Sequence, residues 1–203
     1  MGKPGLPYAA MGDDVTIHPQ AKIVYPECLH LGNAIIIDDF CLILARERTE
    51  IQDFVHIGGG STITGGGTFL MERFAGLSGG VFVYTGNEDY SGASLTNPTI
   101  PLRWRNVTRS RVILRRHAIV GANSVILPGV EIGEGAVVGA NSLVRADVEP
   151  WSINVGSPAR KVGTRPSGTI RRMERELEAH CYRLDGSYVA RRFRDDGPGA
   201  GPT

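Results

Sequence analysis

The stretch LRRHAIVGANSVILPGVEIGEGAVVGANSLV, residues 114–144, places an aliphatic side chain at every sixth position. The members of this series are Leu114, Val120, Ile126, Ile132, Val138 and Val144. An α-helix repeats about every 3.6 residues and a β-strand every two, and neither period accounts for a sustained step of six. A coil with three short flat faces does account for it, because each six-residue unit turns one corner and three corners close one rung.

A longer version of the repeat precedes this stretch. When residues 11–90 are written in rows of twenty, three apolar columns fall into register, and a step of eight closes each row. The columns are Met11, Leu31, Ile51 and Met71, then Ile17, Ile37, Ile57 and Leu77, then Ile23, Ile43, Ile63 and Val83. Such units cannot bury their apolar face alone, so stacked rungs share one core. The sequence therefore predicts an all-β fold, a parallel β-solenoid.

The composition narrows the class of protein. The 203 residues suit one domain with a small appendage. A net charge of +1 argues against nucleic acid or an anionic membrane as the main partner, and no apolar run approaches the roughly twenty residues of a membrane span. The three cysteines have no metal-ligand spacing and fit a reducing compartment. Because the start of the chain also lacks the apolar core of a secretory signal, we expect a cytoplasmic protein.

Two segments depart from the repeat. Residues 84–111 are polar, rich in Gly and Pro and without periodicity, so we expect a loop insertion in a coil domain of residues 11–165. Unstructured loops of this length are usually functional or disordered, and the aromatic and acidic residues here favour function. After the coil, apolar residues at helical spacing predict a short amphipathic helix within residues 166–184, covering the last rung. Residues 185–203 are predicted to be a disordered tail.

The segment VGANSVILPGVEIGEGAVVGANSLVRADVEPWSINVGSPARKV, residues 120–162, resembles the hexapeptide-repeat acyltransferases. This left-handed β-helix family includes galactoside, maltose and serine acetyltransferases, and the chain is most similar in character to the sugar O- and N-acetyltransferases of surface-polysaccharide synthesis. The resemblance implies a left-handed coil, a homotrimer, and acetyl-CoA bound in a groove between subunits. It implies transfer of an acetyl group to a hydroxyl or amine of a sugar or nucleotide-sugar.

The donor-binding residues follow from the resemblance. The thin pantetheine arm needs a groove lined by backbone and small side chains, and the candidates are Gly121, Ala122, Gly139, Ala140 and Ser142. The alternative is that these small residues serve only the turns of the coil. Arg160 and Lys161 stand where the family places cations for the nucleotide phosphates, and Pro158 is expected to fix the preceding turn. A run of charge is otherwise a solvated face.

The general base is harder to assign. A positioned base contributes typically about 10²–10⁴-fold, and histidine suits this work near neutral pH. The family supplies a histidine in the loop or in the rung before it, but this loop has none and Gly79 occupies the other position. His117, which opens the first rung after the loop, is therefore the first candidate, with a structural corner histidine as the alternative, and His56 is the second.

The acidic pair of the loop is a third candidate. Glu88 and Asp89 could orient the base, bind sugar hydroxyls or take the proton themselves if desolvated. Polar and aromatic residues around them are candidates for the acceptor site, with loop packing as the alternative, and rings among them could stack on a sugar or nucleobase. These acceptor-site candidates are Tyr84, Asn87, Tyr90, Asn97 and Trp104.

Two other classes of function remain open at this point. A non-catalytic scaffold is consistent with the missing loop histidine, although the SPARKV segment argues against it. A zinc protein of the γ-carbonic-anhydrase type would need a pair of histidines five positions apart, and no two histidines here have that spacing, so no metal is expected. The absent loop histidine also favours either an amino-sugar acceptor or an unusual base.

Overall fold

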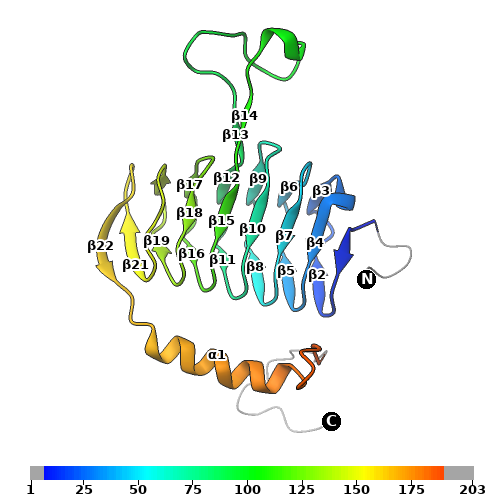
Figure 1. Ribbon diagram of the computed structural model, residues 1–203, viewed down its shortest axis with the longest axis vertical. Helices are drawn as coiled ribbons and strands as arrows, with labels where there is room; N and C mark the ends of the chain where they lie inside the picture. The colour runs from blue at the N-terminus through cyan, green and yellow to red at the C-terminus, as the bar shows by residue number, and fades with distance from the viewer. Residues whose placement is uncertain (1–6, 190–203) are drawn as a thin grey trace. The chain divides into compact units, whose positions relative to one another are not determined.

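The computed structural model describes residues 7–189, and its strands wind into a β-solenoid with three flat faces, called here faces A, B and C (Figure 1). Face A consists of β1 (Ala10–Met11), β4 (Leu29–Leu31), β7 (Thr49–Ile51), β10 (Phe69–Met71), β15 (Val112–Leu114) and β18 (Glu131–Ile132). Face B consists of β2 (Val15–Ile17), β5 (Ile35–Ile37), β8 (Val55–Ile57), β11 (Gly76–Leu77), β16 (Ile119–Val120), β19 (Val137–Val138), β21 (Ser152–Val155) and β22 (Arg160–Thr164). Face C consists of β3 (Lys22–Val24), β6 (Leu42–Leu44), β9 (Thr62–Thr64), β12 (Phe82–Tyr84), β17 (Val125–Ile126) and β20 (Leu143–Val144).

The rungs shorten along the chain. Strand partners lie 20 residues apart before the loop, as for Ile37 beside Ile57, and 18 apart after it, as for Ile119 beside Val137. The two extra residues of the early rungs lie at the corner between faces C and A, where a 3-10 helix, η1 (Pro26–Cys28), joins β3 to β4. The predicted periods of twenty and eighteen are therefore the strand register of the solenoid.

The predicted apolar columns form the core. Leu31, Ile51, Met71, Leu114 and Ile132 point inward from face A and are buried, and the columns of faces B and C are buried likewise from the second rung onward. Burying one such side chain stabilises the fold by about 1.5–3 kcal/mol. The prediction of a β-solenoid is confirmed, and the ladders of side chains are its physical basis.

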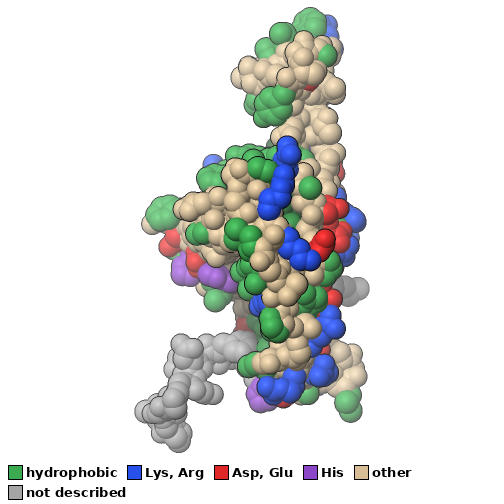
Figure 2. Space-filling model, turned by 90° about the vertical axis from the view of Figure 1, so that its left-hand side faces the viewer, with side chains coloured by type: hydrophobic (Ala, Val, Ile, Leu, Met, Phe, Trp, Pro, Cys, Tyr) green, Lys and Arg blue, Asp and Glu red, His purple; other side chains and the backbone are tan. Residues whose placement is uncertain are grey.

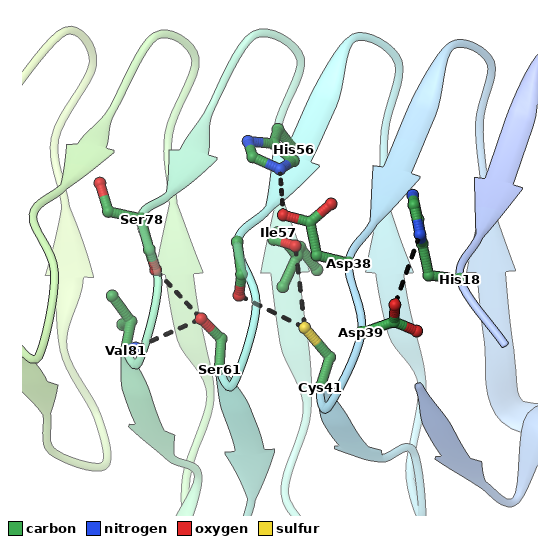
Figure 3. A network of polar contacts seen from close by, with 10 residues as sticks. His18, Asp38, Asp39, Cys41, His56, Ile57, Ser61, Ser78 and Val81 are labelled. Atoms are coloured by element: carbon green, nitrogen blue, oxygen red, sulfur yellow. Dashed lines mark hydrogen bonds and ion pairs between the residues drawn. The ribbon is translucent and has the colours of Figure 1, made fainter. Parts of the chain in front are cut away.

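Small polar side chains complete the core at the corner between faces B and C. Ser61 Oγ donates to Ser78 O at 3.1 Å and accepts from Val81 N at 3.2 Å, which ties two rungs together (Figure 3). Cys41 Sγ lies 3.3 Å from Gly58 O, and burial raises the pKa of its thiol. These buried groups are hydrogen-bonded, so they do not carry the penalty of an unsatisfied polar atom.

The loop insertion leaves the coil between β12 and β15, at the corner between faces C and A, and projects away from it (Figure 1). Its stem is a short antiparallel pair, β13 (Gly86–Asn87) with β14 (Thr108–Arg109), and its tip contains η2 (Leu102–Trp104). Exposed hydrophobic side chains gather on this tip (Figure 2). They belong to Tyr90, Leu95, Leu102 and Trp104.

A second unit begins after Ser167 and contains α1 (Gly168–Cys181), which falls within the predicted range of 166–184. Val189 N donates to Cys181 O at 2.8 Å, and the rings of Tyr182 and Tyr188 meet edge to face. The predicted disordered tail lies outside the described residues from residue 190 onward. Among the described helices, none has the length and apolar character of a membrane span.

Candidate active site

One edge of the coil carries mainly glycine and residues with short side chains. At the corner between faces B and C, successive rungs carry Gly58-Gly59-Gly60, Ser78-Gly79-Gly80, Gly121-Ala122-Asn123 and Gly139-Ala140-Asn141. We call these residues the glycine-rich edge. Neighbouring strands lie about 4.8 Å apart, so the four rungs span roughly 14 Å. A thin ligand can lie against the backbone over that length, and the donor-arm candidates Gly121, Ala122, Gly139 and Ala140 all belong to it.

The coil itself explains part of this composition. A Cβ on Gly121 would lie 2.5 Å from Ala140 N, and one on Gly139 would lie 2.7 Å from Val155 Cγ1. Close stacking of the rungs therefore requires glycine there with or without a ligand. Ala140, in contrast, is exposed on the outside of the edge, where a donor could reach its backbone.

Ser142 has a structural task. Its side chain is buried, and its Oγ accepts a hydrogen bond from Gly156 N at 3.1 Å. The adjacent backbone bonds, Leu143 N to Gly156 O at 3.0 Å and Ala159 N to Leu143 O at 2.8 Å, fasten residues 156–159, including Pro158, against β20. The segment that precedes the basic pair thus closes the C-terminal end of the glycine-rich edge.

The basic residues follow directly in β22. Arg160 pairs in register with Val155, at the end of β21 nearest the glycine-rich edge, and both Arg160 and Lys161 are exposed. Lys161 Nζ lies 2.6 Å from Glu149 Oε2. Together with Arg145, which the sequence reasoning did not single out, they line a hollow of about 150 Å³ at the end of the coil, which Asp147 also lines. Three cations around one hollow can bind phosphate groups.

A histidine and a carboxylate meet beside the other end of this edge. His56 projects from β8 on the outside of face B, and its Nε2 lies 2.9 Å from Asp38 Oδ2 (Figure 3). The His56 side chain is 55% exposed and stands two residues before Gly58. A carboxylate on one ring nitrogen orients the imidazole and leaves the other nitrogen, Nδ1, to exchange a proton with a ligand. Asp38 was missed in the sequence, although the register of the rungs places it beside His56.

His117 lies at a different corner, between faces A and B. Its ring stacks on Phe74 with centroids 5.0 Å apart, Phe74 stacks on Phe54 at 4.9 Å, and Trp151 lies beyond at 6.3 Å. We call these four residues the aromatic ladder. His117 is 8% exposed, and its carbonyl oxygen accepts from Arg165 at 3.0 Å. Its catalytic role stays a prediction, and its surroundings are those of a packed corner ring.

The acidic pair of the loop is engaged within the loop. Glu88 lies 3.3 Å from Arg105, whose side chain is largely buried. Asp89 accepts from Ser91 N at 2.8 Å, from Ser91 Oγ at 2.6 Å and from Ser94 Oγ at 3.0 Å, and these hydrogen bonds hold its pKa below the usual range. A carboxylate stabilised in this way is a weak base, so this geometry favours ordering of the loop over proton transfer.

The acceptor-site candidates are spread over the loop and its root. Tyr84 is in β12 and Asn87 in the loop stem, and Asn97 Oδ1 accepts from Thr99 N at 3.0 Å within a turn. Tyr90 is 86% exposed, and Trp104 is 49% exposed with the Arg103 guanidinium 3.7 Å above its ring. Within the described part of one chain, these residues belong to the corner between faces C and A, whereas His56 stands on face B.

Comparison with known proteins places the chain in a family. Residues 111–146 match the family described as bacterial transferase hexapeptide (six repeats). The chain is 36% identical over 159 residues to the dTDP-4-amino-4,6-dideoxy-D-glucose acyltransferase of Escherichia coli, and the aligned region covers 78% of this chain and 83% of that protein. The chain therefore belongs to the hexapeptide-repeat transferases, as the resemblance of residues 120–162 implied.

Particular relatives narrow the class to acyltransferases. AntD, an N-acyltransferase from Bacillus cereus solved in complex with dTDP and 3-hydroxybutyryl-CoA, superposes with a TM-score of 0.79 at 35% identity, over 86% of this chain and 92% of that chain. A variant of AntD solved with dTDP-4-amino-4,6-dideoxyglucose and coenzyme A gives a TM-score of 0.80. A putative lipopolysaccharide O-acetyltransferase, WbbJ of Escherichia coli (strain K12), is 31% identical over 121 residues, 59% of each protein.

Proposed function

We propose that this protein transfers an acyl group from an acyl-CoA donor to the amino group of a nucleotide-linked amino sugar. The observation that carries the proposal is the arrangement along one side of the coil. The glycine-rich edge has cations at its C-terminal end and the His56–Asp38 pair beside its N-terminal end. The relatives that act on or bind dTDP-linked amino sugars support this class of acceptor over a free hydroxyl.

The donor lies along the glycine-rich edge with its phosphates at the C-terminal end and its thioester near His56. Its phosphates meet Arg160, Lys161 and Arg145 around the hollow at the end of the coil, where charge-assisted hydrogen bonds are roughly twice as strong as neutral ones. Its pantetheine arm runs along the backbone of the glycine-rich edge, where its amides can pair with main-chain groups. Its thioester then reaches the rungs beside His56, and acetyl-CoA is the simplest donor that fills this path.

The chemistry needs one proton transfer. The acceptor nitrogen attacks the thioester carbonyl carbon, so that a C–N bond forms and the C–S bond breaks. His56 Nδ1 accepts the proton that the nitrogen loses and delivers it to the departing sulfur, while Asp38 holds the imidazole at Nε2. The products are the amide and free CoA, and the base returns to its starting state.

We also propose that the protein works as a homotrimer in which the loop of one copy serves the site of another. The loop and its exposed rings leave the corner between faces C and A, on the far side of face C from the glycine-rich edge. Exposed apolar side chains on faces B and C, including Ile36 and Phe82, are suited to contacts between copies. Tyr90 or Trp104 of such a loop would stack on the nucleobase of the acceptor.

The setting of the reaction belongs to the same proposal. A sugar that carries an acylated amino group is a building block of surface polysaccharides, and the O-acetyltransferase relative named for lipopolysaccharide biosynthesis supports that use. The three free cysteines suit the reducing cytoplasm, where acyl-CoA donors are made.

The function is tested by thiol release. Purified protein is incubated with acetyl-CoA and a panel of dTDP-linked sugars with and without an amino group, together with the free amino sugars. We expect release of free CoA with nucleotide-linked amino sugars alone. Release with hydroxyl-only sugars would instead favour O-acylation, and binding of acetyl-CoA without release for any acceptor would favour a scaffold.

The direction of the donor is tested at its phosphate end. Arg160→Ala combined with Lys161→Ala should weaken binding of CoA about tenfold or more, and binding of dephospho-CoA less, because one phosphate contact is already absent. Lys22→Ala, an exposed cation on β3 at the opposite end of the coil, is the matched control. Equal losses for the two ligands would remove the pair from the 3′-phosphate, and calorimetry measures both.

A further inference from the structure

The outward column of face B contains one gap. In register along the face, the outward positions are Thr16, Ile36, His56, Gly76, Ile119, Val137 and Ile153. Gly76 is the member without a side chain, and it lies between His56 on one strand and Ile119 on the next. Since strands are about 4.8 Å apart, the two flanking positions are separated by roughly 10 Å.

The coil does not require glycine at this position. A Cβ built on Gly76 meets no atom within 4 Å, and the residue is not among those with positive φ. Gly58 on the neighbouring edge differs, since a Cβ there would lie 2.7 Å from Gly79 N. A glycine inside a strand costs about 0.5–1 kcal/mol relative to alanine. Such a residue marks a place where a ligand or another backbone comes close.

The walls of the gap indicate which part of a ligand would enter it. On one side stands the imidazole of His56, oriented by Asp38, and on the other side Ile119 exposes 37% of an aliphatic side chain. A thioester carbon within reach of His56 carries two substituents, the sulfur of the donor arm and the acyl chain. The arm occupies the glycine-rich edge, so the acyl chain has the apolar space over Gly76 before it.

We propose that the gap over Gly76, between His56 and Ile119, receives the acyl chain of the donor, and that residue 76 limits the length of acyl group that the enzyme transfers. This inference rests on the proposed function and adds the specificity of the donor. The gap left by one absent side chain has room for a chain of a few carbons, so the wild-type protein accepts acyl groups longer than acetyl. A side chain at position 76 would shorten the space and exclude them.

The test compares Gly76→Val with wild type and with Thr16→Leu, a control that adds bulk to the same column two rungs away from His56. The readout is kcat/KM by thiol release with acetyl-, propionyl- and butyryl-CoA and a fixed acceptor. We expect Gly76→Val to lower the ratio of butyryl to acetyl turnover about tenfold or more, since one or two methylenes in a shaped pocket are worth roughly that much discrimination. The control should keep the wild-type ratio, and an unchanged ratio in Gly76→Val would overturn the proposal.

A binding measurement separates this inference from the function on which it rests. Calorimetry with butyryl-CoA and acetyl-CoA needs no acceptor, and wild type should bind butyryl-CoA more tightly while Gly76→Val should lose that preference. If the preference behaves this way but no acceptor is turned over, the proposed acceptor fails and the acyl gap stands. Light scattering on both variants completes the test. A change of oligomeric state in Gly76→Val, with the preference retained, would show that another copy fills the gap and would overturn the inference.

Discussion

The two corners that flank face B solve the same backbone problem in opposite ways. Both place residues with positive φ in successive rungs, as at Phe74 and His117 on one side and at Gly80 and Asn141 on the other. A side chain in this conformation costs about 1–2 kcal/mol. The aromatic ladder offsets the cost by stacking, at about 0.5–1.5 kcal/mol per pair. The glycine-rich edge instead places glycine or asparagine at these positions, the residues that tolerate this conformation best, and so carries no bulky side chain there. One corner stabilises the coil, and the other is left available to a ligand.

The largest expected effect comes from a substitution that prevents the whole coil, including both corners, from folding. Ile132→Asp places a charge among the fully buried residues of face A, where it has no partner and where each rung depends on its neighbours. We expect the protein not to fold, as measured by circular dichroism and by its solubility. Val162→Asp, at an exposed aliphatic residue of β22, is the control and should fold. A folded Ile132→Asp protein would mean that the rungs are less interdependent than the ladders indicate.

The next prediction concerns His56, which stands on face B beside the glycine-rich edge. His56→Ala should lower kcat by about 10²–10⁴-fold and leave the affinity for acetyl-CoA nearly unchanged, because the imidazole is assigned to proton transfer and not to donor binding. Asp38→Asn should give a smaller loss of kcat with the same donor affinity, since it disturbs only the orientation of the ring. Turnover of His56→Ala at the wild-type rate would exclude this residue as the base.

At the corner of the aromatic ladder, a substitution should lower stability and leave kcat nearly unchanged. His117→Ala removes one ring from the aromatic ladder and should lower the free energy of unfolding by about 1–3 kcal/mol, while kcat stays within a few-fold of wild type. His117→Phe should restore the stability because it restores a stacking ring. Urea denaturation and thiol release give the two readouts. A large loss of kcat in His117→Phe, with stability retained, would move the base to this corner and reverse the comparison.

The smallest expected effect is a pH dependence next to the packed corner. Arg115 donates to both oxygens of Glu131, at 2.7 Å and 2.8 Å, and this contact holds the Glu131 pKa below its usual 4.5. Because the pKa is lowered in the folded state, the contribution to stability is present above about pH 4.5 and is lost as pH falls through the folded-state pKa. The pair is partly exposed, so the contribution is under about 1 kcal/mol.

Its measurement is the difference in unfolding free energy between wild type and Glu131→Gln at pH 7 and pH 3. The difference should shrink at the lower pH. A constant difference would show that the ion pair does not stabilise this side of the coil.

The apolar pattern predicted the fold well because the spacing of the apolar residues equals the number of residues that each face of the coil takes up. Steps of six and eight fixed which residues point inward, and the break at residues 84–111 fixed where the loop leaves. The helix was predicted from spacing alone, and α1 ends a few residues before the predicted limit.

The candidate site was predicted less completely, for a physical reason. His117 was ranked first because it follows the loop along the chain, and the structure places it after β15 at the next corner, where its catalytic role stays a prediction. What surrounds an outward-facing residue is set by residues 18–20 positions away, as Asp38 is for His56, and not by its neighbours in sequence. In the proposed homotrimer, the role of the loop residues depends in addition on a second copy of the chain.

The rungs of the coil differ in length at the corner between faces C and A. This corner carries the two extra residues of the early rungs and also the whole loop, while faces A, B and C keep their register on both sides of it. Under the proposed function, in which this loop contacts the acceptor, exchanging the segment between β12 and β15 would change the acceptor preference without redesign of the scaffold. The rest of the coil would still bind the donor, while the exchanged loop would bind a different sugar.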